Sequence, residues 1–161
     1  MVIGNVSGYH IEFLETLQNP EWPSKLPQRN WLLLVIVDAV DKKLFERVTV
    51  ECLKNQPLGI CCVGSGAYVL EDWFDEEVVT VAMTWEEKHQ KPYDYTYAPV
   101  TTADSDVNEG FWYATNVAPH MGRDATRTVV CLDLTGKYLQ QVLELIQLIN
   151  SGWSPSDISD D

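Results

Sequence analysis

Seven consecutive apolar residues, Trp31 to Val37, followed by Asp38, form a run that no polar side chain interrupts. Because apolar and polar residues do not alternate here, neither face of this segment can lie in water. A short strand covered on both faces has this pattern, which is typical of parallel sheets between two layers of helices. A buried helical segment is the alternative, but the β-branched residues Val35, Ile36 and Val37 favour a strand. We therefore predict a central strand over residues 31–37, with Asp38 at its carboxyl end.

The patterns around this strand predict an alternation of strands and helices along the chain. Apolar periodicity and capping residues predict four helices. The first covers 7–18 with Ser7 as its cap, and the second covers 41–54 with Asp41 as its cap. The third follows the turn 64–66, and the last runs from its cap Thr135 to residue 151. Apolar and β-branched runs predict further strands over 58–63, 78–84, 111–117 and 128–134.

This order predicts an α/β three-layer sandwich around a mostly parallel, five-stranded, Rossmann-like sheet. The connector 118–124 is too short for a crossover helix, so the last two strands are predicted to be antiparallel or joined by one helical turn. We expect a single domain over 1–161. Within it we expect a proline-rich connector over 20–30 anchored by Trp22 and Leu26, a long irregular loop over 86–109 and an acidic tail over 154–161.

Charge restricts the classes of partner. The formal net charge is -13, from 24 acidic against 11 basic residues. A chain of this charge is not expected to bind a nucleic-acid backbone or an anionic membrane surface, both of which require clustered Lys and Arg. A basic protein partner is permitted, and a well-solvated acidic protein is the plain alternative. The N-terminus has no signal-peptide pattern and no apolar run could span a bilayer, so we expect a cytoplasmic protein.

The four cysteines, Cys52, Cys61, Cys62 and Cys131, do not follow a zinc-binding pattern. Adjacent Cys61 and Cys62 would point to opposite faces of a strand and would not bridge each other. We expect buried, reduced thiols and predict no metal ion and no cofactor. Catalysis by Cys61 or Cys62 with His89 or His120 is disfavoured, because burial makes a thiol inert.

Two features suggest a surface for a protein partner. On the helix after the glycine turn, four acids are predicted to face outward as like-charged neighbours, namely Glu71, Asp72, Asp75 and Glu76. Further along, Tyr93, Tyr95 and Tyr97 alternate, so an extended segment would place their rings on one side. Tyrosines of this kind anchor interfaces. A solvated helix face and a loop fixed to its own domain are the respective alternatives.

A second candidate site follows from the topology. Ligands of parallel sheets bind beyond the carboxyl ends of the strands. There the sequence predicts Asp38, Ser65, Trp85, Glu86 and Glu87, a set that could serve a metal- or nucleotide-dependent enzyme. The Gly64-Ser65-Gly66 turn resembles a phosphate-binding turn, but Val69 replaces the third glycine of that pattern. It also lacks the Gly-x-Ser-x-Gly elbow of serine hydrolases.

The chain also resembles an uncharacterised family of small acidic bacterial α/β proteins, a domain of unknown function, over residues 29–112. The resemblance lies in Trp-Leu-Leu-Leu-Val at 31–35, Gly-x-Cys-Cys-x-Gly at 59–64, the Asp72, Asp75 and Glu76 spacing, Met83-Thr84-Trp85, and Glu109-Gly110-Phe111-Trp112. Similar proteins carry a second Cys after the glycine turn and a His after Thr-Trp, where this chain has Ala67 and Glu86. The resemblance implies the fold and brings no known activity.

Together these observations predict a non-catalytic, acidic protein-binding domain of the immunity or toxin-neutralising type. Its expected partner is a basic protein, or a second copy of the chain in a homodimer. The alternative is a small metal- or nucleotide-dependent enzyme at the carboxyl ends of the strands.

Overall fold

The computed structural model describes residues 1–120 and 125–156. Its strands are β1 (Val2–Val6), β2 (Tyr9–Glu15), β3 (Trp31–Ile36), β4 (Gly59–Val63), β5 (Val100–Asp104) and β6 (Thr128–Asp133). Its α-helices are α1 (Lys42–Lys54), α2 (Ala67–His89), α3 (Val107–Asn116) and α4 (Leu139–Asn150), with 3-10 turns η1 (Trp22–Lys25), η2 (Tyr95–Tyr97) and η3 (Ala118–His120). Residues 121–124 of the predicted connector and 157–161 of the predicted acidic tail lie outside the described residues.

The strands form one six-stranded sheet in the order β1-β2-β6-β3-β4-β5. All neighbouring pairs are parallel except the antiparallel pair of β1 and β2. The predicted central strand at 31–37 is confirmed as β3, which lies between β6 and β4. The predicted count of five strands is wrong, as is the antiparallel placement of 128–134. That strand, β6, is parallel to both neighbours because α3 and η3 carry the chain back across the sheet before it begins.

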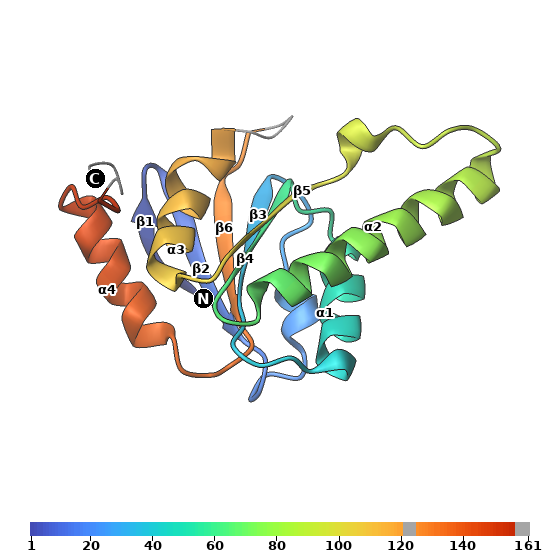
Figure 1. Cartoon of the computed structure of the whole chain (residues 1–161). Helices are drawn as coiled ribbons and strands as arrows, with labels where there is room; N and C mark the ends of the chain where they lie inside the picture. The colour runs from blue at the N-terminus through green and yellow to red at the C-terminus, as the bar shows by residue number, and fades with distance from the viewer. Residues whose placement is uncertain (121–124, 157–161) are drawn as a thin grey trace, which may run out of the picture.

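Helices cover both faces of the sheet (Figure 1). Leu33 and Val35 of β3 belong to the core that α1 and α2 close, whereas Leu32 and Leu34 belong to the core that α3 and α4 close. All residues of β3 are buried. The uninterrupted apolar run is therefore explained by two dry faces, as predicted for an α/β sandwich.

The first predicted helix, over 7–18, is wrong, because this segment holds the turn and the second strand, β2, of the β1–β2 hairpin. Ser7 and Gly8 have φ values of 51° and 86°, the left-handed pair that a two-residue hairpin turn requires. Ser7 therefore makes the turn and caps no helix. Ile11 enters one core and Leu14 the other. A strand buried on both faces gives apolar spacings that a helix also gives, so the pattern did not distinguish them.

The predicted strand over 78–84 is also wrong, because these residues continue α2 to His89. No Gly or Pro interrupts 67–89, and each β-branched residue costs a helix only a few tenths of a kcal/mol. Val78, Ala82 and Trp85 keep the helical spacing of the buried stripe. Figure 1 shows the second half of α2 extending beyond the sheet, where Met83 is 63% exposed.

Two further predictions fail after α2. The supposedly irregular segment 86–109 contains the end of α2, η2, β5 and the start of α3. The predicted strand over 111–117 lies in α3, which Asp106 caps by accepting a hydrogen bond from the Glu109 amide at 3.0 Å. Phe111, Ala114 and Thr115 are its buried face. The bulky aromatic run suggested a strand, but burial recurs every three or four residues, as in a helix.

The last helix begins later than predicted, and Thr135 does not cap it. The buried Asp133 carboxylate instead accepts hydrogen bonds from the backbone amides of Thr135 at 2.8 Å and Tyr138 at 3.0 Å. A carboxylate with this many donors fixes the turn that leads from β6 into α4.

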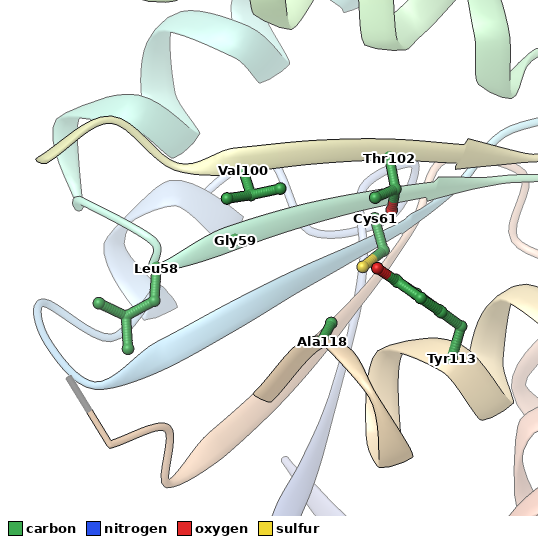
Figure 2. A pocket seen from close by; sticks show the side chains of 7 residues that line it. All are labelled: Leu58, Gly59, Cys61, Val100, Thr102, Tyr113 and Ala118. Carbon is green, nitrogen blue, oxygen red and sulfur yellow. The ribbon is translucent and has the colours of Figure 1, made fainter. Parts of the chain in front are cut away.

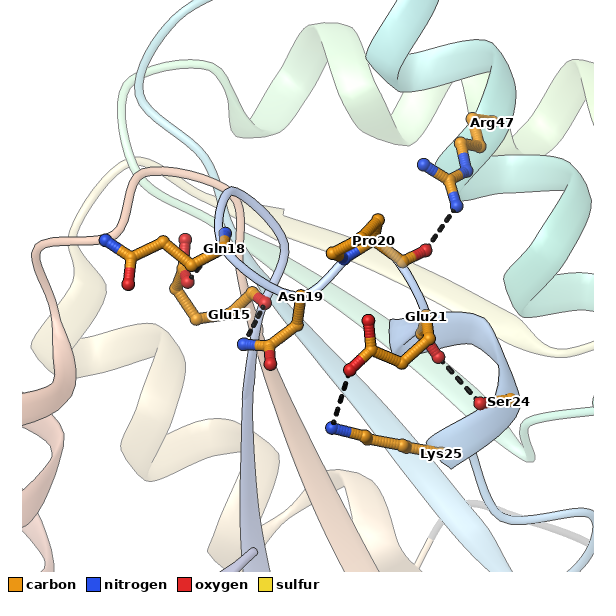
Figure 3. Close-up of polar contacts among 8 residues, drawn as sticks. All are labelled: Glu15, Gln18, Asn19, Pro20, Glu21, Ser24, Lys25 and Arg47. Atoms are coloured by element: carbon orange, nitrogen blue, oxygen red, sulfur yellow. Dashed lines mark hydrogen bonds and ion pairs between the residues drawn. The ribbon is translucent and has the colours of Figure 1, made fainter.

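The connector between β2 and β3 is held to the body as predicted, with Trp22 and Leu26 buried. The Arg47 guanidinium donates a hydrogen bond to the Pro20 carbonyl at 2.7 Å (Figure 3). The same guanidinium lies over the Trp22 ring, 5.7 Å from its centroid. Figure 3 also shows the exposed Glu21–Lys25 ion pair, whose nitrogen and oxygen are 3.5 Å apart. The connector therefore follows the surface in a fixed path.

Candidate functional site

At the carboxyl ends of the strands, the predicted ligand residues Asp38 and Ser65 do lie together. The Ser65 hydroxyl donates to the Asp38 carbonyl at 2.7 Å. The Asp38 carboxylate accepts from the Tyr138 hydroxyl, with oxygen–oxygen distances of 3.0 and 3.1 Å. Burial, and then this bond to Asp38, raise the pKa of Tyr138. The polar groups of Asp38, Ser65 and Tyr138 are thus hydrogen-bonded to one another. They lie where the chain leaves β3 for a helix on one face of the sheet and leaves β6 for a helix on the other face.

The glycines of the 64–66 turn allow the turn to approach the end of β3. A Cβ at Gly64, where φ is 109°, would collide with the Val37 carbonyl oxygen, and one at Gly66 would lie 3.1 Å from Cγ2 of Val37. Residues 37–38 therefore occupy the space that side chains at positions 64 and 66 would need. Close packing accounts for both glycines.

The other predicted members of this site lie elsewhere. Trp85, Glu86 and Glu87 belong to the last turns of α2, which begins beside Ser65. Twenty residues of helix separate Glu86 from the turn, or about 30 Å at 1.5 Å per residue. The expectation of one five-residue site fails because it depended on a strand at 78–84. In residues 1–120 and 125–156, no three His, Cys, Asp or Glu side chains gather in a way that could hold a metal ion.

The thiols are buried, as predicted. Figure 2 shows the Cys61 side chain pointing toward Tyr113 of α3, beside a cavity of about 10 Å³ that Thr102 also lines. Burial raises the pKa of Cys61 to about 11, although a hydrogen bond with Thr102 opposes the rise. Burial also raises the pKa values of Cys52, Cys62 and Cys131. A cavity of this size holds about one water molecule and no substrate.

We therefore expect all four thiols to resist a thiol reagent in the folded protein at about pH 8, because the nucleophile is the thiolate. With a pKa of about 11, roughly one Cys61 thiol in a thousand is ionised at that pH, even before access is considered. The measurement is colorimetric thiol titration, with a denatured sample as the control in which all four thiols react. Rapid labelling of Cys61 without denaturant would contradict this picture and restore a cysteine mechanism.

A larger concavity lies at the opposite, amino end of the strands. It has a volume of about 660 Å³ and is bounded by four parts of the chain: the second half of α2, residues 93–100, and the two segments that lead into β3 and into β4. We call it the amino-end groove. Its apolar walls include Val78, Val81, Trp85, Tyr93, Tyr97 and Pro99, and its polar rim includes Gln28, Arg29, Asn30, Gln56, Asp94 and Thr96. Volumes of this order are typical of ligand and peptide sites.

The aromatic side chains beside this groove form a connected cluster. Trp85 stacks on His89 with ring centroids 4.3 Å apart, and meets Tyr93 edge-to-face at 5.8 Å. Tyr93 meets Tyr95 edge-to-face at 5.1 Å, while the Tyr93 amide donates to Glu86 at 2.9 Å. The predicted single row of rings is wrong, because residues 95–97 form a 3-10 turn. Tyr93 fixes the segment to α2, and Tyr95 and Tyr97 remain 55% and 65% exposed.

The predicted acidic face is present on α2, with one correction. Asp72, Asp75 and Glu76 are exposed, but Glu71 is partly covered. Burial, followed by the charges of Asp75 and Asp72, raises the pKa of Glu71. Asp75 accepts a hydrogen bond from the Thr101 hydroxyl of β5 at 2.6 Å. The acids therefore lie beside the outer strand of the sheet.

The sequence did not identify the amino-end groove. Its walls include Val78 and Val81, for which the sequence predicts a strand, and residues 28–30 and 56–58, which carry no recognisable motif. The one available signal was the absence of Gly and Pro over 67–89, which allows a helix long enough to pass the sheet.

The fold and these contacts define the class of protein: a mostly parallel α/β sandwich whose long second helix forms an aromatic groove at the amino ends of the strands. The model of the domain of unknown function DUF7684 matches residues 9–147, and the chain belongs to this family. The predicted resemblance to an uncharacterised family is thereby confirmed and extends well beyond 29–112. No curated protein matches the chain, and no solved structure matches it. Among the described residues, no helix has the length and apolar character needed to cross a membrane.

Proposed function

We propose that the chain is a non-catalytic domain that binds a basic protein through the surface formed by α2 and residues 93–100. The observation that carries this proposal is the exposure of Tyr97, which lines the amino-end groove, and of Tyr95, whose ring meets Tyr93 in the wall of the groove. These tyrosines follow α2, the helix that carries the acids, in the chain. Rigid aromatic side chains beside an apolar concavity are the usual anchors of protein interfaces. Neutralisation of a basic toxin is one role that such a surface would suit.

Electrostatics supports the choice of a basic partner. The formal net charge of -13 produces a field that attracts a cationic protein from a distance and orients its approach. The metal- or nucleotide-dependent alternative has no comparable support, because Asp38, Ser65 and Tyr138 are bound to one another and Trp85 to Glu87 lie on the far part of α2.

The test is capture of partners from an extract of the cells that produce the protein, using the immobilised chain. We expect retention of a basic protein, and we expect Tyr95→Ala to weaken its affinity about tenfold or more because an exposed anchor is lost. The association rate should fall about tenfold as salt rises from about 0.05 M to about 0.5 M.

The matched control is Leu148→Ala, which removes a comparably exposed apolar side chain (48%) from α4, at the opposite end of the molecule from the tip of α2 (Figure 1). It should leave affinity unchanged. The proposal is refuted if no basic protein is retained. It is also refuted if neither salt nor Tyr95→Ala changes the binding of the retained protein.

A further inference from the structure

The two edges of the sheet are protected very differently. The β1 edge carries a register irregularity between Val2 and Gly4, and its Asn5 carbonyl accepts a hydrogen bond from the Asn150 side chain at 2.9 Å. Bulges and covering groups of this kind prevent a further strand from pairing with an edge. The β1 edge is therefore closed to partners.

In the part of the chain that the structure describes, no register irregularity and no side-chain hydrogen bond to the backbone protects the β5 edge. Its register with β4 is continuous from Val100 to Asp104, and residues 100–103 carry no charge and no proline. The Asp104 carbonyl accepts a hydrogen bond from the Gly64 amide, so the backbone of Asp104 is directed toward β4. Because backbone groups alternate along a strand, the amides and carbonyls of Thr101 and Ala103 point away from the sheet. These groups are a ready template for another strand.

The surroundings of β5 are strongly acidic. Residues 55–120, which contain β4, α2, β5 and α3, hold two basic residues, Lys88 and Lys91. The same span holds eleven acids: Glu71, Asp72, Asp75, Glu76, Glu77, Glu86, Glu87, Asp94, Asp104, Asp106 and Glu109. Asp75 touches β5 through Thr101, and Asp104 ends the strand. A second copy of the chain would bring the same acids face to face, whereas a basic segment would complement them.

We propose that the β5 edge accepts an extended, basic segment of the protein partner as an additional strand of the sheet. Backbone hydrogen bonds to Thr101 and Ala103 would supply affinity, as in other complexes formed by strand addition. Lysine and arginine side chains of the segment would lie among the acids of α2. Val100, at the start of β5, also lines the amino-end groove, so a strand on β5 leads directly into that groove. This inference rests on the proposed function and specifies how the partner is held.

The probe is a synthetic peptide that alternates lysine with valine and threonine, titrated into the full chain by fluorescence anisotropy. The test variant is Ala103→Pro, which removes an outward amide while leaving pairing with β4 intact, since proline is tolerated on edge strands in this orientation. We expect about a tenfold loss of peptide affinity, because a hydrogen bond is lost and the proline ring obstructs the added strand. Ala103→Ser, which keeps the amide, should bind as the wild type does. A peptide with alternate amides N-methylated, or with glutamate in place of lysine, should not bind.

Amide hydrogen exchange of the unmodified chain gives a second readout that does not depend on a variant. The amides of Thr101 and Ala103 should exchange at least about tenfold more slowly with peptide bound. Binding without this protection, and with Ala103→Pro unaffected, would overturn strand addition, as would no binding of the lysine peptide. Protection that grows with protein concentration in the absence of peptide would instead assign the edge to a second copy of the chain. The capture experiment with Tyr95→Ala tests the proposed function independently of these results. Strand addition can therefore fail while the proposed function stands.

Discussion

Replacing Trp31 by alanine is expected to lower the free energy of unfolding by about 3–5 kcal/mol. The indole is fully buried at the amino end of β3, in the core closed by α1 and α2. Its Nε1 donates a hydrogen bond to the Asn55 carbonyl at 2.8 Å, at the end of α1. The substitution opens a large cavity and removes the donor of this partly buried carbonyl, so two costs act together.

Urea unfolding followed by circular dichroism measures this change. Met83→Ala is the control, because Met83 is 63% exposed on the part of α2 that extends beyond the sheet, and it should shift stability by less than about 0.5 kcal/mol. A loss below about 1 kcal/mol for Trp31→Ala would mean that the β3 end is not packed as described.

Replacing Gly110 by alanine is expected to destabilise the protein by about 1–3 kcal/mol, although alanine is the better helix former. Gly110 lies within α3, where the helix crosses β4, and an added Cβ would collide with Cγ1 of Val63. Val63 is 1% exposed and β-branched, so it cannot turn aside into free space. The steric cost therefore exceeds the gain of about 1 kcal/mol in helix propensity.

A double-mutant cycle with Val63→Ala isolates this contact. In the Val63→Ala background, the collision with Cγ1 is absent and only the milder contact with Cβ of residue 63, at 3.1 Å, remains. Gly110→Ala should therefore cost at least about 1 kcal/mol less there than in the wild type, which is the coupling energy of the pair. Equal effects of Gly110→Ala in both backgrounds would show that the helix–strand contact at Val63 is not the cause.

Short-range patterns in the sequence were sufficient to predict the central part of the fold. The unbroken apolar run at 31–37 required two dry faces, and Asp41 and the 58–63 segment placed the next helix and strand. The errors arose where helix and strand compete closely. Val78 to Thr84 has strand-forming residues, but it continues a helix without a breaker, and from this helix Trp85 packs against Tyr93.

For the candidate sites, the sequence predicted which side chains take part but not where they lie relative to one another. Tyr93, Tyr95 and Tyr97 were identified, yet their proximity to α2 depends on where that helix ends. Asp38 and Ser65 were correctly brought together, because both follow neighbouring parallel strands. The predicted positions of Trp85, Glu86 and Glu87 are wrong because they depend on a strand over 78–84. These residues instead lie near the end of the long helix α2.

The sequence by itself determined the α/β class, the two-sided burial of β3, the buried thiols and the acidic character, because these depend on residue type and short-range pattern. Only the tertiary structure decided that β6 lies between β2 and β3, that α2 reaches past the sheet to form the amino-end groove, and that β5 lies at an edge of the sheet. Those features depend on contacts between residues far apart in the chain, which local propensities do not specify.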